Sequence, residues 1–291
     1  MRIGEEIRNL VVALDRRYRS SWDVRSIAHV MDIGHQSVAN ILREARGPRP
    51  KKALQTHDRR TRFLFRDVMW SSDFMKLPDG RELIKTMDEM SRFRLGWDAE
   101  KTETAALAVR HGEAIIERMG RGPLVWKFDH GSPFTSALFQ DFLARHNILP
   151  YPIPPRSPWV NGRNERDNQE VQNWLIPLDF KKLTTQEIDR DIDDGMLMLN
   201  YIKPRAVLGY RKSADVYFNT DGVEELDREW LKLDLKDIKC RLGWTGWREN
   251  EKINRRAIRQ LLQKWSLYEE WEEIPKGAKI VNTSEALDVS F

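Results

Sequence analysis

The stretch from Val68 to Trp174 alternates short strand-like runs with longer helical runs. Three strand-like runs come first and are joined by short turns such as Pro78-Asp79-Gly80, so neighbouring strands can pair antiparallel. Helical and strand-like runs then alternate, which is typical of an α/β layer design. We expect strands at 68–77, 82–87, 92–97, 124–128 and 148–152, and helices at 102–119, 136–146 and, after a proline-rich loop to 162, 163–174.

A separate helical unit precedes this layer. Apolar residues recur at steps of three and four over 5–18, and two shorter helices flank a turn at Asp32-Ile33-Gly34. Helix, tight turn, helix is the pattern of a helix-turn-helix DNA-binding unit. A structural three-helix bundle is the alternative. On the DNA-binding interpretation, the candidate contacts on the outer face of the last helix are His35, Gln36, Ser37, Asn40 and Arg43.

Charge is distributed unevenly along the chain. Residues 1–66 contain 15 Lys and Arg but only 7 Asp and Glu, a net charge of +8, so 67–291 carries −4 of the total of +4. This division is typical of a basic nucleic-acid-binding arm on an acidic body, although a merely solvated basic face is the alternative. We expect 48–66 to be a basic linker that follows phosphates. Its candidate contacts are Lys51, Lys52, Arg59, Arg60 and Arg62.

Several classes of protein are excluded by what the sequence lacks. The single Cys240 permits no disulfide framework, and the six histidines lack the paired spacing of a zinc module. Neither a P-loop nor a dinucleotide-binding glycine motif occurs. The apolar runs are too short to cross a bilayer and no secretion signal is present, so we expect a cytoplasmic protein without a membrane partner.

Three carboxylates occupy positions suited to chemistry. Asp73 lies in the middle of the first expected strand, Asp129 ends the fourth, and Glu165 opens the helix that follows the proline-rich loop. Gathering three carboxylates is unfavourable unless a cation neutralises them. All-oxygen ligands suit Mg²⁺ or Mn²⁺, and two such ions can activate the attacking oxygen and stabilise the leaving oxygen of a phosphodiester. The pattern therefore predicts phosphoryl transfer on nucleic acid.

The spacing of these carboxylates resembles that of retroviral-integrase-like DDE transposases. Fifty-five residues separate Asp73 from Asp129, and 35 separate Asp129 from Glu165. Further strings resemble the family in the family's order: 70–74, 87–93, 129–134, 157–166 and 200–210. The N-terminal part differs from the zinc module of retroviral integrases and is similar to bacterial insertion-sequence transposases.

The resemblance implies a ribonuclease H-like catalytic core at 67–215, with a five-stranded mixed sheet and helices on both faces, after an all-α helix-turn-helix domain at 1–47. The region 216–291 stays without a fold assignment. The resemblance also implies that Asp73, Asp129 and Glu165 hold two metal ions. The implied reaction is cleavage at the 3′ end of a DNA element and transfer of that end into target DNA by an oligomer. Two alternatives stay open: a DNA-binding regulator with an integrase-like scaffold, and a ribonuclease H-like nuclease that does not join strands.

The residues around Glu165 give further expectations. Gln169 and Gln172 share its helix face and should look toward DNA, whereas Asp167 and Glu170 should project away from the sheet. Arg163 and Arg166 are candidate phosphate contacts, with simple solvation as the alternative. Asp88 and Glu89, at the end of the second strand, are expected to have a structural role.

Overall fold

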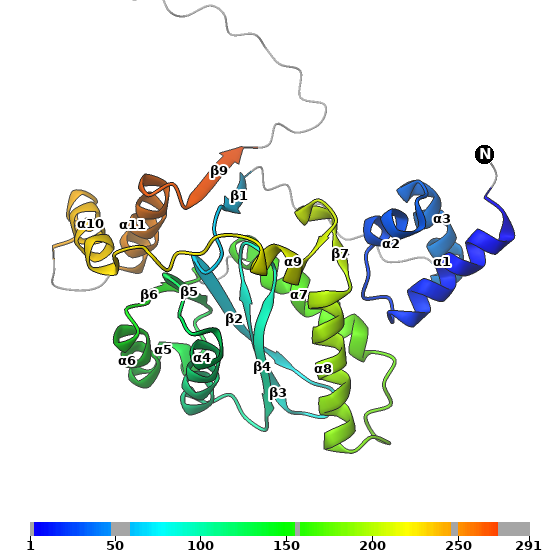
Figure 1. Cartoon of the computed structure of the whole chain (residues 1–291). Helices are drawn as coiled ribbons and strands as arrows, with labels where there is room; N and C mark the ends of the chain where they lie inside the picture. Colours follow the sequence, from blue (N-terminus) through cyan, green and yellow to red (C-terminus); the bar gives the residue numbers. More distant parts are fainter. Residues whose placement is uncertain (1–2, 48–58, 155–157, 246–249, 273–291) are drawn as a thin grey trace, which may run out of the picture.

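The computed structural model describes residues 3–47, 59–154, 158–245 and 250–272; of residues 59, 60, 158–161, 271 and 272 it gives the backbone alone. Lys51 and Lys52 therefore lie outside the described residues. Three regions follow one another along the chain: an N-terminal helical domain, a central sheet flanked by helices, and a C-terminal helical region (Figure 1). Within the described ranges no helix is both long and apolar enough to cross a membrane.

The N-terminal domain consists of α1 (Glu5–Arg17), α2 (Val24–Met31) and α3 (His35–Arg46). Asp23 begins α2, because its side chain accepts hydrogen bonds from the backbone N–H groups of Arg25 and Ser26. Asp32 ends α2 in the left-handed conformation, with φ of 50°. The predicted helices and turn are therefore confirmed.

The central sheet has the order β4-β3-β2-β5-β6. Neighbours β2, β3 and β4 pair antiparallel, and β5 pairs parallel with both β2 and β6. The strands are β2 (Met69–Lys76), β3 (Glu82–Asp88), β4 (Arg94–Glu100), β5 (Val125–Phe128) and β6 (Leu149–Pro152). This mixed five-stranded sheet confirms the expected layer.

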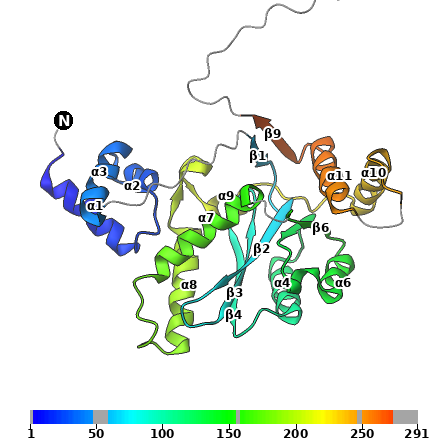
Figure 2. The ribbon, with the colours of Figure 1, turned by 180° about the vertical axis from the view of Figure 1, so that it is seen from behind.

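Helices cover both faces of the sheet (Figures 1 and 2). On one face, Trp70 and Ile84 pack in a buried cluster with Trp126 and residues of the helices beyond β4 and β5. On the other face, Met75 and Leu83 join a different cluster, as expected because successive strand residues point to opposite faces. The covering helices are α4 (Ala105–Met119), α5 (Ser132–Thr135) and α6 (Ala137–Arg145) on the first face, and α7 (Pro158–Leu175) and α8 (Thr185–Tyr201) on the second.

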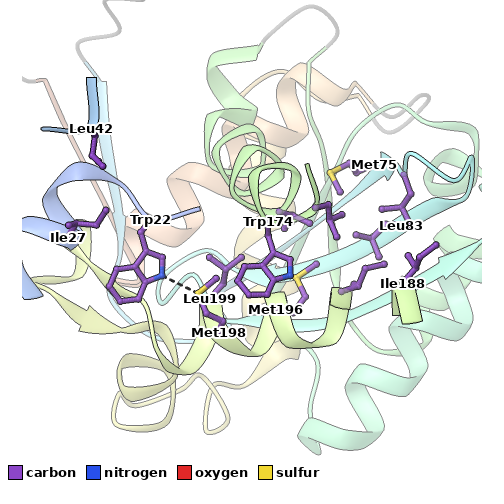
Figure 3. Packing of buried hydrophobic residues seen from close by; sticks show 14 of the residues in the cluster. Trp22, Ile27, Leu42, Met75, Leu83, Trp174, Ile188, Met196, Met198 and Leu199 are labelled. Atoms are coloured by element: carbon purple, nitrogen blue, oxygen red, sulfur yellow. Dashed lines mark hydrogen bonds between the residues drawn. The ribbon is translucent and has the colours of Figure 1, made fainter. Parts of the chain in front are cut away.

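The N-terminal domain shares its hydrophobic core with α7 and α8. Figure 3 shows Trp22 beside Met198 and Leu199, and the Trp22 indole Nε1 lies 3.1 Å from the Met198 sulfur. Gly195 lets Trp174 approach α8 closely, since a Cβ at that position would lie 2.5 Å from the Trp174 ring. The helical domain is thus packed directly against the core.

The C-terminal region folds back onto the start of the core. β9 (Tyr268–Glu272) pairs antiparallel with β1 (Arg59–Phe63), which lies in the expected linker. The expectation of a linker is therefore wrong for 59–63, because these residues find a partner strand about 200 positions later. The remaining elements are β7 (Pro204–Arg205), a 3₁₀ turn (Ala206–Leu208), β8 (Arg211–Lys212), α9 (Ser213–Phe218), α10 (Arg228–Arg241) and α11 (Glu251–Lys264).

Candidate active site

Asp73 and Asp129 lie next to each other on neighbouring strands. In the parallel pairing of β2 with β5, Ser71 is opposite Lys127. Two residues further along each strand, Asp73 of β2 lies beside Asp129, which follows the last residue of β5. Both side chains are on the same face of the sheet. The backbone N–H of Gly131 donates a 2.9 Å hydrogen bond to Asp129 Oδ1 and fixes this carboxylate at the strand end.

The two aspartates differ in their surroundings. Asp73 is 8% exposed, whereas Asp129 is half-buried. Burial raises the pKa of Asp73, and the negative charge of Asp129 adds to this rise. Lys85, opposite Asp73 on β3, acts in the other direction. The interior of β2 and the end of β5 therefore bring together two like charges that a nearby cation would stabilise.

Asn168 on α7 completes the surroundings of Asp73, and the sequence analysis missed it. Its amide Nδ2 donates a 2.7 Å hydrogen bond to Asp73 Oδ2. Its Oδ1 is buried and has no hydrogen-bond partner among the described residues. The spacing could have indicated this residue, because Asn168 lies three positions after Glu165 and so projects from the neighbouring turn of the helix.

Glu165 is exposed on α7, one turn before Asn168. In the described part of the chain, no three His, Cys, Asp or Glu side chains gather closely enough to hold a metal ion. The structure thus brings Asp73 and Asp129 together and leaves Glu165 at the margin of the site. Gln172 is exposed and Gln169 half-buried on the same side of α7, in line with the expected shared face.

Asp167 and Glu170 do not project away from the sheet, so that expectation is wrong. Both are buried between α7 and the sheet. Asp167 pairs with Lys85 of β3 and Arg94 of β4, and Glu170 pairs with Lys203 at 3.0 Å. Burial alone would raise the pKa of each carboxyl, but the neighbouring cations hold both pKa values below their ordinary range. Cations of β3, of β4 and of the segment that follows α8 therefore hold these acidic side chains of α7 on its inner face.

Asp88 and Glu89 have the structural role that the sequence indicates. Asp88 is fully buried and accepts hydrogen bonds from the backbone N–H groups of Asp67 and Ser91. Glu89 is buried beside Lys127 and accepts a 2.7 Å hydrogen bond from Arg163 Nη1.

Arg163 has partners within the chain, whereas Arg166 is largely open to solvent. Arg163 Nη2 donates to the Thr61 carbonyl at 2.6 Å and so connects α7 to β1. The Arg166 side chain is 58% exposed, with its Nε 3.7 Å from Glu170. The structure therefore gives Arg163 a bridging position and leaves Arg166 free to reach a partner outside the chain.

The other candidate DNA contacts lie on the surface. Ser37 is half-buried, while His35, Gln36, Asn40 and Arg43 are exposed on α3. Arg62 is exposed and pairs with Glu269 of β9 at 3.4 Å. Arg59 and Arg60 are placed in β1 by their backbone alone.

Comparison with known proteins identifies the segment that carries both aspartates. The family model of the integrase core domain matches residues 66–158. This part of the chain matches the integrase core domain. Its mixed sheet with helices on both faces is the ribonuclease H-like fold expected from the sequence. The match indicates a function of the integrase or transposase type, which is polynucleotidyl transfer in general terms; the matched segment ends before Glu165.

Solved integrase structures resemble the chain at low sequence identity. The catalytic core domain of HTLV-2 integrase in complex with magnesium, in a dimeric form, is 22% identical over 54% of this chain and 99% of that one, with a TM-score of 0.45. The simian T-cell lymphotropic virus intasome in complex with PP2A regulatory subunit B56 gamma is 18% identical over 71% and 74%, with a TM-score of 0.49. The catalytic core domain of BIV integrase is 16% identical over 52% and 94%, with a TM-score of 0.44. No curated protein matches the chain.

Proposed function

We propose that this protein is a DNA transposase of the integrase type, which cleaves the 3′ ends of a DNA element and transfers them into target DNA. The observation that carries the proposal is the pair Asp73 and Asp129: Asp73 lies within β2, and Asp129 lies beside it just after the end of the parallel strand β5, in the segment that matches the integrase core domain. Acidic residues at this position of the sheet suit a reaction at a phosphodiester, because they can hold the cations that neutralise its charge.

The residues at this site fit divalent metal ions with oxygen ligands. Asp73 and Asp129 offer carboxylates, and the buried Oδ1 of Asn168 is a further oxygen without a hydrogen-bond partner among the described residues. We propose that Asp73, Asp129 and Glu165 hold two Mg²⁺ or Mn²⁺ ions, with Glu165 approaching the aspartates when the ions bind. When bound, such ions activate the attacking oxygen and stabilise the leaving oxygen.

The chain's own side chains orient this site. Asn168 holds the Asp73 carboxylate through its 2.7 Å hydrogen bond, so α7 and β2 keep a fixed relation at the reacting end of the strands. Lys85 and Asp167, paired across β3 and α7, stiffen the same contact. A site that is oriented before substrate binds loses less free energy in reorganisation during the reaction.

We propose that residues 1–66 bind the ends of the element and that Arg166, Gln169 and Gln172 of α7 contact DNA. The exposed side of α3 supports this division, because the second helix of a helix-turn-helix enters the major groove. Paired insertion requires two element ends in one complex, so the active form is proposed to be a homo-oligomer on DNA.

The test is the variant Asp129→Asn, with Asp141→Asn on the exposed surface of α6 as the matched control. Asp129→Asn should retain DNA binding in a mobility-shift assay and lose 3′ end cleavage and strand transfer with Mg²⁺ or Mn²⁺, while the control retains all three. Full strand transfer by Asp129→Asn would contradict the proposal. Cleavage by the wild-type protein without any joining would favour a nuclease instead.

A further inference from the structure

A large cleft lies between the N-terminal domain, β1 and the side of α7 that faces away from Asp73. Its volume is about 1450 Å³. Pockets for small ligands occupy roughly 300 to 1,000 Å³, so this space is large for a metabolite.

The cleft is lined by eight arginines and four carboxylates. The carboxylates pair with lysines behind the wall and also with arginines of the cleft: Glu89 with Lys127, Arg92 and Arg163, Asp167 with Lys85, Glu170 with Lys203 and Arg205, and Asp23 with Lys203. The lining arginines are Arg25, Arg46, Arg62, Arg92, Arg163, Arg166, Arg205 and Arg211. Because lysines behind the wall neutralise part of the charge of these carboxylates, the surface of the cleft keeps an excess of positive charge.

Three of these guanidinium groups crowd together at the base of the cleft. Burial, together with the positive charges of Arg163 and Arg205, lowers the pKa of Arg92 to about 9. Arg92 still carries its charge at neutral pH, so the fold holds three like charges near one another. Glu89, which pairs with Arg92 and Arg163, and Glu170, which pairs with Arg205, offset part of this repulsion within the chain.

The mouth of the cleft adds cations that can reach a partner. Arg25, Arg166 and Arg211 are exposed and come from α2, α7 and β8. Charges supplied by three separate elements form an extended track, which suits a polymer with regularly spaced charges better than a single ion.

We propose that this cleft binds the phosphodiester backbone of a DNA segment that passes between the N-terminal domain and the catalytic core. The inference rests on the proposed function and adds a DNA-binding track on the flank of α7 opposite Asp73, separate from the exposed side of α3. Arginine suits such a track because its guanidinium group binds phosphate oxygens in pairs.

The first experiment measures the affinity for a linear duplex over a series of KCl concentrations by fluorescence anisotropy. The test variant carries Arg25→Gln, Arg166→Gln and Arg211→Gln; the control carries Arg110→Gln, Arg145→Gln and Arg241→Gln, which are exposed residues of α4, α6 and α10. Each lost phosphate contact lowers the slope of log K against log salt by about 0.9, so the slope of the test variant should fall by about 2 to 3. The control, with the same change in net charge, should keep the wild-type slope.

The second experiment measures proximity. In a Cys240→Ser background, Arg166→Cys should form a disulfide with a duplex that carries a thiol tether on one phosphate, and Arg145→Cys should not. An unchanged salt slope of the test variant, or equal trapping at both positions, overturns the inference. Protection of the wild-type protein against heat by inorganic phosphate, without a loss of duplex affinity in the test variant, also overturns it, because the cleft would then bind free phosphate.

The failure of this inference is distinguishable from failure of the proposed function. If the wild-type protein binds no duplex, or Asp129→Asn transfers strands normally, the proposed function fails. If the wild-type protein binds and joins DNA while the arginine variant behaves identically, the cleft alone is refuted.

Discussion

Replacing Glu170 by glutamine should destabilise the protein strongly although it changes the side-chain shape little. The Glu170 side chain is 5% exposed and lies 3.0 Å from Lys203 Nζ, 3.1 Å from Arg205 Nη2 and 3.3 Å from Arg94 Nη2. Glutamine would remove the carboxylate that pairs with Arg205 and would leave Arg94 and Lys203 with only their second partners, Asp167 and Asp23. Removing one partner of a buried ion pair costs about 3 to 5 kcal/mol, a large fraction of the 5 to 15 kcal/mol typical of a folded domain.

Urea unfolding followed by circular dichroism measures this loss. Glu117→Gln, at an exposed position of α4, serves as the control and should change the free energy of unfolding by about 0.5 kcal/mol or less. A loss below about 1 kcal/mol for Glu170→Gln would refute the reasoning, because the cations would then be adequately solvated without the carboxylate.

The pH dependence of the free energy of unfolding tests the role of the Glu170 carboxylate independently. Burial opposes ionisation of Glu170, but Arg205, Lys203 and Arg94 outweigh it and keep the folded-state pKa below the ordinary value of 4.5. The stabilisation is therefore present above about pH 4.5 and is lost as the pH falls toward the folded-state pKa. The difference in stability between the wild-type protein and Glu170→Gln should shrink below pH 4.5, and a constant difference down to pH 2 would contradict the assignment.

Two further variants test the site and the packing. Asn168→Ala removes the hydrogen bond to Asp73 and should lower single-turnover strand transfer by about 10- to 100-fold while DNA affinity is retained; unchanged transfer would exclude a positioning role. Gly195→Ala places a Cβ 2.5 Å from the Trp174 ring and should cost about 1 to 3 kcal/mol in urea unfolding. Gly162→Ala on α7 meets nothing within 4 Å and should be neutral or mildly stabilising, so equal losses at both positions would contradict the packing argument.

The helices and strands that depend on nearby residues, such as capping residues and apolar periodicity, could be predicted from the sequence. Asp23 and Asp32 indicate the bounds of α2, and the apolar runs from Val68 onward indicate the central strands, because periodicity reports burial directly. The beginning of α7 differs from the expectation: the helix begins at Pro158, within the expected loop, because proline is favoured in the first turn of a helix.

Partners that are distant in sequence could not be predicted. The sequence of α7 alone predicts that Glu170 faces solvent, and its burial is explained by its ion pairs with Arg94, Lys203 and Arg205. The pair Asp73 and Asp129 was predicted from spacing, whereas the hydrogen bond from Asn168 depends on the angle at which α7 crosses β2. Periodicity within one helix does not determine that angle.

The pairing of β1 with β9 has a consequence for the order of events during synthesis. Phe63 of β1 pairs with Tyr268 of β9. Because these residues are about 200 positions apart, β1 emerges from the ribosome long before its partner strand. At about 5 to 20 residues per second, β1 waits on the order of 10 to 40 s with an open edge. Such edges invite pairing with other chains, and charged side chains oppose it. Arg59, Arg60 and Arg62 put three positive charges on β1, and such charge disfavours pairing with other chains until β9 has been synthesised.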